Sequence, residues 1–249
     1  MPADHQTANE FDQPFIAATY DQVEGSRDDL DLYAAIAEEL GARSVLDIGC
    51  GTGTLAVRLA GQGLDVIGVD PAGRMLEVAR AKPGADRVHW VHGTASDVAA
   101  AEPAALPVDL AVMTGNVAQV FVTDEDWLAT LRAVHACSAP GGHLVFETRI
   151  PQRRAWEGWA TDAESTFQVP GVGEVRDVLE ILEVDLPRVS FRSTNHLPDG
   201  SVVTAESTLV FRPLEDIDRT LAEAGFSLLE TRDAPDRPGR EWVVVARRE

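Results

Sequence analysis

Short apolar runs alternate with amphipathic stretches from residue 44 to residue 148. The amphipathic stretches, at residues 54–62, 73–81 and 124–137, repeat their apolar positions at helical spacing. Brief runs of valine, isoleucine and leucine separated by helices are typical of a parallel sheet covered on both faces, because each crossover returns the chain to the same edge. The apolar runs cover residues 45–48, 66–69, 88–91, 110–113 and 144–146. The pattern therefore predicts a doubly wound α/β fold.

The segments on either side of this region extend the prediction. A helical pattern at 28–40 ends at Gly41, before the first strand. After Ile150 the apolar and polar residues partly alternate, which predicts extended segments at 173–185, 189–196 and 201–212. A helix at 213–224 and strands at 227–231 and 242–246 follow. Together these features predict a seven-stranded, mostly parallel, Rossmann-like sheet with an antiparallel β insertion after the fifth strand.

Charge narrows the classes of partner. The chain of 249 residues carries 21 basic and 41 acidic side chains, a formal net charge of −20. Binding to nucleic acid or to anionic lipid requires clustered basic residues, so both partners are disfavoured. The polar, acidic N-terminus and the lack of about 18 uninterrupted apolar residues speak against secretion and membrane spanning. We expect a cytoplasmic protein in which Cys50 and Cys137 are reduced.

A glycine-rich turn follows the first predicted strand. Gly49, Gly51 and Gly53 stand at alternate positions before a predicted helix, an arrangement that lets backbone amides approach a ligand. The glycines could instead make only a tight connection between strand and helix. The dinucleotide pattern G-x-G-x-x-G fits poorly, because Thr54 occupies the place of its third glycine.

Asp47, two residues before this turn, completes a longer motif. The string resembles motif I of the class I S-adenosylmethionine-dependent methyltransferases, and the resemblance extends over about residues 30–150. In this family the carboxylate that ends the second strand, here Asp70, accepts hydrogen bonds from both ribose hydroxyls. Asp70 could also be a plain cap for the following helix. The resemblance implies S-adenosyl-L-methionine as cofactor and S-adenosyl-L-homocysteine as product.

The resemblance also assigns further site residues. Met75 would lie against the adenine, although it is also a candidate core residue. The family often has an acidic residue where this chain has Thr94, so the contact could come from the Ala95 backbone or from Asp97. Tyr20 would belong to a lid that touches the ligands or only packs on the domain. The implied cofactor contacts are Tyr20, Asp47, Gly49, Cys50, Gly51, Gly53, Asp70, Pro71, Met75, Thr94, Ala95, Thr114, Gly115, Asn116 and Gln119.

These assignments predict four regions. Residues 1–27 form a lid segment, 28–149 the cofactor-binding core, 150–212 an antiparallel cover over the acceptor, and 213–249 complete the core. This layout is similar to that of the amino-sugar N-methyltransferases. Trp156 and Trp159 would line the acceptor pocket or belong to the core of the insertion.

The predicted reaction is transfer of a methyl group to a nitrogen or oxygen of a small molecule. An oxygen acceptor usually needs a base, for which Glu147, His143 and His196 are candidates. The histidines show no metal-ligand spacing, so no metal is expected. A homodimer is possible. Two alternatives stay open, a non-catalytic protein that binds S-adenosylmethionine and a nicotinamide-dependent oxidoreductase.

Overall fold

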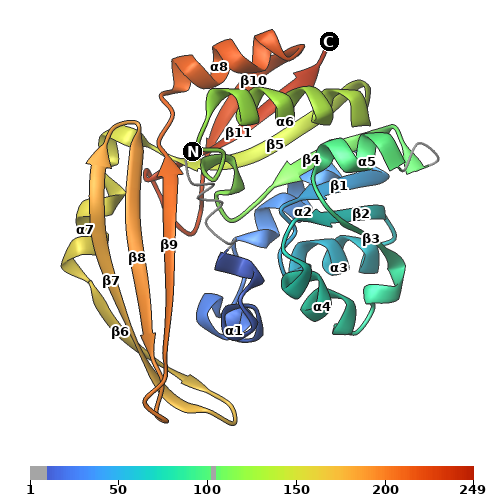
Figure 1. Ribbon diagram of the computed structural model, residues 1–249. Coiled ribbons are helices and arrows are strands. Elements are labelled where there is room, and N and C mark those ends of the chain that lie inside the picture. The colour runs from blue at the N-terminus through green and yellow to red at the C-terminus, as the bar shows by residue number, and fades with distance from the viewer. Residues whose placement is uncertain (1–9, 102–104) are drawn as a thin grey trace, which may run out of the picture.

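The main sheet has seven strands in the order β10-β11-β5-β4-β1-β2-β3 (Figure 1). The computed structural model describes residues 10–101 and 105–249. Neighbouring strands among β1 to β5 pair in parallel, while β11 is antiparallel to both β5 and β10. The strands are β1 (Ser44–Ile48), β2 (Asp65–Asp70), β3 (Val88–His92), β4 (Val108–Met113), β5 (Ser138–Arg149), β10 (Phe226–Asp233) and β11 (Glu241–Arg248). The predicted fold class is confirmed.

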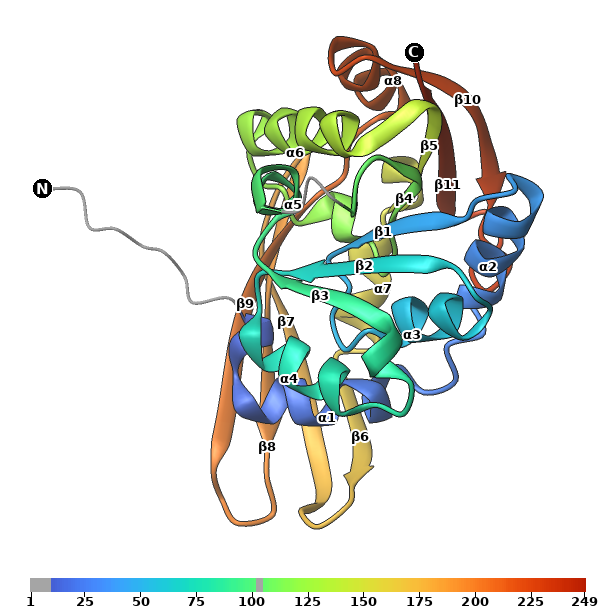
Figure 2. The ribbon, with the colours of Figure 1, turned by 90° about the vertical axis from the view of Figure 1, so that its right-hand side faces the viewer.

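Helices cover both faces of this sheet (Figures 1 and 2). Helices α2 (Leu30–Glu39) and α3 (Thr54–Gly61) pack on the face that Val45 of β1 enters. Helices α5 (Ala95–Ala101), α6 (Asp124–Cys137) and α8 (Leu214–Glu223) pack on the face that receives Leu46 and Ile48. Successive side chains of β1 are therefore buried on opposite faces, which explains why a buried parallel strand is apolar without alternation. Single-turn 3-10 helices are η1 (Glu10–Asp12), η2 (Ala85–Arg87), η4 (Val117–Gln119) and η5 (Pro151–Arg153).

A second, antiparallel sheet follows β5. It contains β6 (Glu164–Val169), β7 (Gly173–Asp185), β8 (Arg188–His196) and β9 (Val202–Val210), and helix α7 (Ala155–Thr161) precedes it. The sequence predicts only three extended segments here; β6 and α7 are additions from the structure. Along β6 only Val169 is buried, so the strand has almost no apolar pattern to reveal it.

The core of this inserted sheet decides whether Trp156 lines a pocket or belongs to the core of the insertion. Trp156 is 4% exposed and packs with Val189 and Phe211, its ring centroid 4.7 Å from that of Phe211. Trp156 thus belongs to the core of the insertion. Trp159 is only partly buried and lies at the edge of the same cluster.

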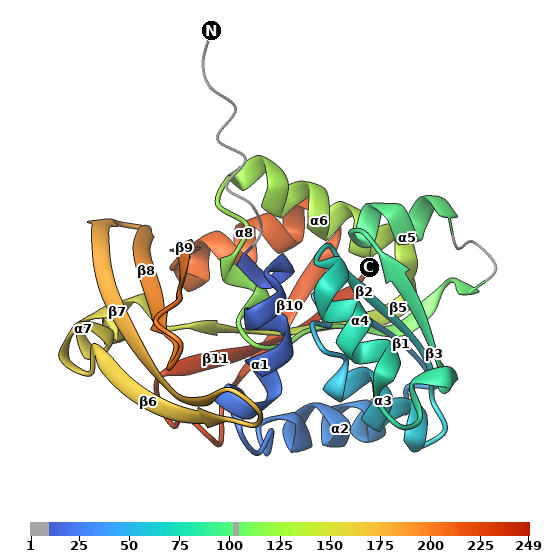
Figure 3. The same cartoon turned by 60° about the horizontal axis from the view of Figure 1, so that its bottom comes forward.

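Strand order determines where a ligand can bind. The chain runs from β1 outward to β2 and β3, and β4 then returns to the opposite side of β1. Loops after β1 and β4 diverge at such a switch point and leave a crevice at the carboxyl ends of the strands. Helix α1 (Pro14–Glu24) lies beside this edge, between α4 (Gly73–Ala81) and the inserted sheet (Figure 3). Among the described residues, no helix is long and apolar enough to cross a bilayer.

Candidate functional site

A pocket opens at the switch point between β1 and β4. Its walls include the glycine turn after β1, the start of α3, and Thr114 and Gly115 after β4. Tyr20 of α1 and Arg27 close it on the N-terminal side. Burial raises the pKa of the Cys50 thiol, another wall residue, well above its usual value. The structure therefore brings Tyr20 together with five of the residues predicted after β1 and β4, an uncharged thiol among them: Gly49, Cys50, Gly51, Thr114 and Gly115.

The three glycines of the turn serve different needs. All have positive φ, but a β-carbon on Gly49 would lie 2.6 Å from a methyl carbon of Val117. A β-carbon on Gly53 would lie 2.3 Å from the Trp90 ring. One on Gly51 would meet no atom within 4 Å. Packing thus accounts for the first and third glycines, while Gly51 is the one that leaves backbone open to a ligand.

Asp70 ends β2 with a carboxylate that is 7% exposed. One oxygen accepts a hydrogen bond from the Gly51 amide at 2.8 Å and the other from the Ala72 amide at 2.7 Å. Burial raises the pKa of Asp70, and these two backbone donors oppose that shift. Asp70 thus ties the glycine turn to the start of α4. Each oxygen keeps a further lone pair for a ligand hydroxyl.

Asp47 is a buried carboxylate without a partner. It is 1% exposed, and neither oxygen has a hydrogen-bond partner among the described residues. Burial and the Asp70 carboxylate raise the pKa of Asp47 to about 7. The charge of Arg27 and the nearby Ala56 backbone amide, which does not reach hydrogen-bond geometry, oppose this shift. Buried polar atoms are nearly always hydrogen-bonded, so an unpaired carboxylate at this position indicates a binding site for a donor.

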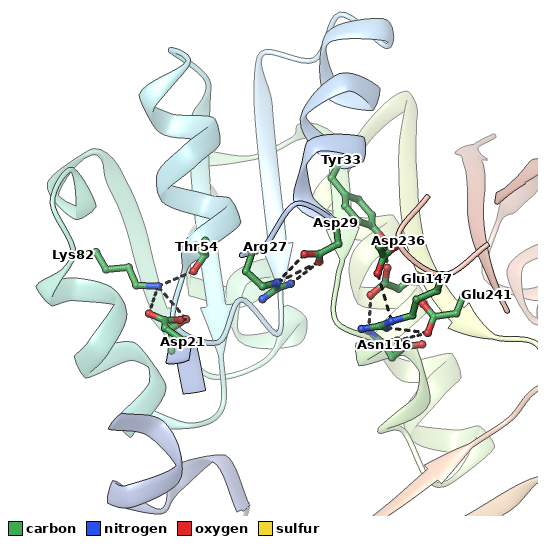
Figure 4. Close-up of polar contacts among 12 residues, drawn as sticks. Asp21, Arg27, Asp29, Tyr33, Thr54, Lys82, Asn116, Glu147, Asp236 and Glu241 are labelled. Atoms are coloured by element: carbon green, nitrogen blue, oxygen red, sulfur yellow. Dashed lines mark hydrogen bonds and ion pairs between the residues drawn. The ribbon is translucent and has the colours of Figure 1, made fainter. Parts of the chain in front are cut away.

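Arg27 is a pocket residue that sequence analysis misses. It lies in the loop between α1 and α2, and its guanidinium contacts the Asp29 carboxylate at 2.9 Å (Figure 4). Its side chain is 16% exposed and lines the pocket. A single arginine in a loop has no periodicity or motif that would distinguish it. Among the described residues, Arg27 is the one charged residue of the pocket lining. Asp47 and Asp70 do not line the pocket, and Asp70 contacts its wall through the Gly51 amide.

The only lysine of the chain fastens α1 over this pocket. Lys82 Nζ lies 2.7 Å from the Asp21 carboxylate of α1 and donates to the Thr54 hydroxyl at 2.7 Å (Figure 4). The Thr52 hydroxyl donates to the same Asp21 carboxylate at 2.5 Å. The hydroxyl of the adjacent Tyr20 would lie 4.0 Å from a β-carbon on Gly115. We call Asp21, Thr52, Thr54 and Lys82 the α1 latch, since they join α1 to the glycine turn.

A second group of buried polar residues lies behind the pocket. Glu147 of β5 accepts a hydrogen bond from the Tyr33 hydroxyl at 2.6 Å and another from the Asn116 amide at 3.0 Å. The Asn116 side chain donates to Glu241 of β11 at 3.2 Å (Figure 4). Burial raises the pKa of Glu147, which keeps its proton more readily than an exposed glutamate. Of the three candidate bases, Glu147 lies nearest in the chain of contacts to the pocket, through Asn116 and its neighbour Gly115.

The part of the chain that contains the pocket is similar to known proteins. Residues 45–142 match the family model for a methyltransferase domain. A ubiquinone biosynthesis O-methyltransferase of Pectobacterium carotovorum is 33% identical over 122 residues, which cover 48% of this chain and 48% of that protein. An uncharacterized methyltransferase of Mycobacterium tuberculosis is 37% identical over 121 residues, covering 46% of this chain and 44% of that protein.

Residues 45–142 form a methyltransferase domain. The predicted resemblance is thus confirmed for this domain, whose span includes the glycine turn, Asp47, Asp70 and Thr114. The chain spans about half the length of these two curated relatives.

Solved structures extend the likeness in fold beyond the methyltransferase domain. The CcbJ methyltransferase from Streptomyces caelestis has a TM-score of 0.75 and 23% identity, covering 96% of this chain and 97% of that chain. CalS10, an amino pentose methyltransferase from Micromonospora echinaspora whose structure holds S-adenosylmethionine, has a TM-score of 0.68 and 22% identity, with coverage of 95% and 97%. At these identities the likeness shows the fold alone.

Several predicted cofactor residues do not line the pocket of the methyltransferase domain. Met75 is 1% exposed and packs with Ala17 and Ala72 beneath α1. Thr94 donates to Asp97 through both its amide and its hydroxyl at 2.8 Å, while Ala95 is buried at the start of α5. Pro71 is exposed, and its carbonyl lies 3.0 Å from His92 Nε2.

Two other predicted residues, Asn116 and Gln119, are engaged within the protein. The Gln119 side chain donates to the Val210 carbonyl at 3.2 Å and accepts from Arg149 at 2.9 Å. It therefore joins the loop after β4 to the end of the inserted sheet. Asn116 contacts Glu147 and Glu241 as described above, and its Oδ1 has no partner among the described residues.

The two histidine candidates lie far along their strands from the pocket. His143 pairs with Leu110 of β4 and Arg247 of β11, whereas Phe146 is the β5 residue opposite Met113, where β4 ends. His196 is the last residue of β8 and pairs with Val202 of β9. Neither lines the pocket. Glu147 does not line the pocket either, but it accepts a hydrogen bond from the amide of Asn116, the neighbour of the wall residue Gly115.

Proposed function

We propose that this chain transfers a methyl group from S-adenosyl-L-methionine to a nitrogen or oxygen of a small-molecule acceptor. The observation that carries the proposal is the set of charges around the glycine turn, where Arg27 lines the pocket and Asp47 and Asp70 lie next to it in the fold. Asp70, Asp47 and Arg27 match the ribose hydroxyls, the ammonium and the carboxylate of this cofactor, respectively. The methyltransferase domain supplies the reaction class.

Asp47 and Arg27 would hold the amino-acid end of the cofactor. An ammonium group would supply the donors that both Asp47 oxygens lack, and its charge would favour the ionised carboxylate. Arg27 presents a guanidinium to a carboxylate, a pairing that is short and strong when water is excluded. Asp29 occupies part of the same guanidinium, so it also fixes the direction in which Arg27 points.

Asp70 would hold the ribose. Its two oxygens already accept one backbone amide each, which sets their orientation before a ligand arrives. A vicinal diol can then donate one hydroxyl to each oxygen. The capping and ribose roles are therefore compatible in one carboxylate. Thr94, Ala95, Met75 and Pro71 remain predicted contacts.

The bound cofactor supplies an electrophilic methyl group, and the protein need mainly bring an acceptor atom into line with it and exclude water. Thr114 and Gly115 are small residues at the pocket wall, so neither side chain is bulky enough to block an acceptor. For a hydroxyl acceptor, Glu147 would receive the proton, since its raised pKa favours the protonated carboxyl. The predicted lid at residues 1–27, of which 1–9 lie outside the described residues, would cover the cofactor, and residues 150–212 would cover the acceptor. A cytoplasmic location and a homodimer remain predictions.

The test is an activity assay. Purified protein with S-adenosylmethionine is offered a panel of amines, phenols and acids, and product is followed by mass together with S-adenosylhomocysteine release. We expect both to appear in equal amounts with at least one acceptor. Calorimetric titration with S-adenosylhomocysteine and with NAD in parallel separates the oxidoreductase alternative. Binding of NAD alone, or tight S-adenosylhomocysteine binding without turnover of any acceptor, contradicts the proposed activity.

Lys82→Met tests the α1 latch. The change removes the Asp21 ion pair, whose partners are 21% and 41% exposed in their side chains, and the donor to Thr54. For a partly exposed pair of this kind we expect a loss of about 1 kcal/mol, seen as a severalfold faster release of S-adenosylhomocysteine in stopped-flow measurements. Arg219→Met removes two exposed ion pairs on α8, to Asp216 and Glu223, and serves as the control. An unchanged release rate in Lys82→Met contradicts a latching role.

A further inference from the structure

A second cavity, next to the first, is lined by arginines. We call it the arginine cavity after the five basic residues in its lining, which are Arg149, Arg153, Arg154, Arg237 and Arg240. The chain has only 21 basic residues against 41 acidic ones, yet five basic and four acidic side chains line this cavity. Positive charge is therefore concentrated here against the trend of the whole chain. Such a local positive charge attracts an anion even though the net charge of the protein has the same sign as the anion.

The cavity joins two segments that are distant in sequence. Arg149 ends β5, and Arg153 and Arg154 follow it. Arg237 and Arg240 belong to the loop between β10 and β11. The Arg153 guanidinium lies 3.7 Å from where a β-carbon on Gly239 would stand, so the two segments meet across the opening. Helix α7 and the strands β6 and β7 form the remaining wall.

Arg149 is the innermost guanidinium. Its side chain is 20% exposed, lies 5.2 Å over the Trp159 ring and donates to Gln119 at 2.9 Å. Its carboxylate neighbour, Glu241, is 3.5 Å away and is shared with Arg237 at 2.9 Å. Burial lowers the pKa of Arg149 despite Glu241, which means that the nearby carboxylates do not fully offset the lost hydration.

Arg153 and Arg240 have free guanidiniums. Neither forms a side-chain hydrogen bond or ion pair within the described part of the chain, and both are exposed at the cavity. The acidic residues of the wall are mostly engaged. Glu157 pairs with Arg154 at 2.8 Å, and Asp177 accepts from Ser193 at 2.6 Å, while Asp162 is exposed. Two unpaired planar guanidiniums therefore face the opening, and their donors match the oxygens of carboxylate or phosphate.

One hydrogen bond links this cavity to the cofactor pocket. Gly115 lines the pocket, the adjacent Asn116 donates to Glu241 at 3.2 Å, and Glu241 lines the arginine cavity (Figure 4). A ligand in the cavity thus lies behind the wall that carries Gly115. We propose that the arginine cavity binds the carboxylate or phosphate group of a small-molecule ligand, which is the methyl acceptor if the proposed function holds.

The experiment measures anion binding without the cofactor. Inorganic phosphate and citrate are titrated into the wild-type protein by calorimetry at low ionic strength, one probe for each oxyanion class. The variant Arg153→Gln/Arg240→Gln removes the two unpaired guanidiniums, both exposed, so the fold should be kept. The control Arg87→Gln/Arg247→Gln makes the same charge change at two exposed positions outside the cavity.

We expect at least one anion to bind the wild type with a dissociation constant in the millimolar range or tighter. The cavity variant should lose tenfold or more in affinity, and the control less than twofold. Failure of both anions to bind, or equal losses in the two variants, overturns the proposal. S-Adenosylhomocysteine is titrated into the same samples. If the wild type does not bind it, the proposed function is contradicted, whereas the anion site is judged by the phosphate and citrate titrations alone.

Discussion

Asp70→Ala is expected to weaken binding of S-adenosylhomocysteine by about 1 to 3 kcal/mol, since the buried hydroxyls lose a charged acceptor. The carboxylate is 7% exposed, and each oxygen is already oriented by one backbone amide. Alanine removes both acceptors for the ribose and also frees the Gly51 and Ala72 amides. Calorimetric titration measures the change as roughly a 5- to 150-fold increase in the dissociation constant.

Two further variants separate the ribose contact from the structural role of Asp70. Asp70→Asn keeps the shape and one acceptor oxygen, so it should fall between wild type and Asp70→Ala. Asp65→Ala removes the same charge from the exposed beginning of β2 and should bind S-adenosylhomocysteine normally. Thermal melts show whether Asp70→Ala has lost stability through its two freed amides. Unchanged affinity in Asp70→Ala would show that Asp70 is only a cap.

The main sheet could be predicted because its strands carry a local signal. The strands β1, β2 and β4 are buried along nearly their whole length, so each is a run of apolar residues between helices. The motif at Asp47 to Gly53 adds chemistry to that pattern. Helix α1 was expected only as a lid segment, since its residues give little sign of a helix beyond Pro14 at its first turn.

The charged parts of the site could not be predicted because contacts over long sequence distances create them. Lys82 and Asp21 are 61 positions apart, and the arginine cavity joins the end of β5 to a loop near residue 237. Nothing in the local sequence of Arg27 or Arg240 distinguishes it from other arginines of the chain. The histidine candidates failed to reach the pocket for the same reason. Their residue type makes them possible bases, but the sequence does not show that neither His143 nor His196 lines the pocket.

Asp47→Asn is expected to change stability and cofactor affinity in opposite directions. The pKa of Asp47 is raised from 3.8 to about 7 by burial and by Asp70. The folded protein therefore holds this proton more tightly than the unfolded chain. The stabilisation from that proton is complete below about pH 4 and is lost as the pH rises through 7. Above pH 7 the ionised, unpaired carboxylate destabilises the apoprotein by roughly 4 kcal/mol, taking 1.36 kcal/mol for each pKa unit.

Asparagine removes this destabilisation, because the amide stays uncharged at every pH, although burying it also costs some free energy. We expect Asp47→Asn to raise the free energy of unfolding of the apoprotein by up to about 4 kcal/mol at pH 8 and to leave it unchanged or lower at pH 4. The comparison of the two pH values within one variant is the control. Thermal and denaturant unfolding measure the stability at each pH.

The same substitution should weaken S-adenosylhomocysteine binding tenfold or more at pH 8, since the ammonium loses its carboxylate. A buried charge that destabilises the empty protein and is neutralised by its ligand is a common exchange of stability for function. A variant stabilised at pH 8 that still binds normally would place the ammonium elsewhere. A variant destabilised at pH 8 would mean that Asp47 has a partner within the protein, and the pocket would then lack the unpaired charge on which the assignment depends.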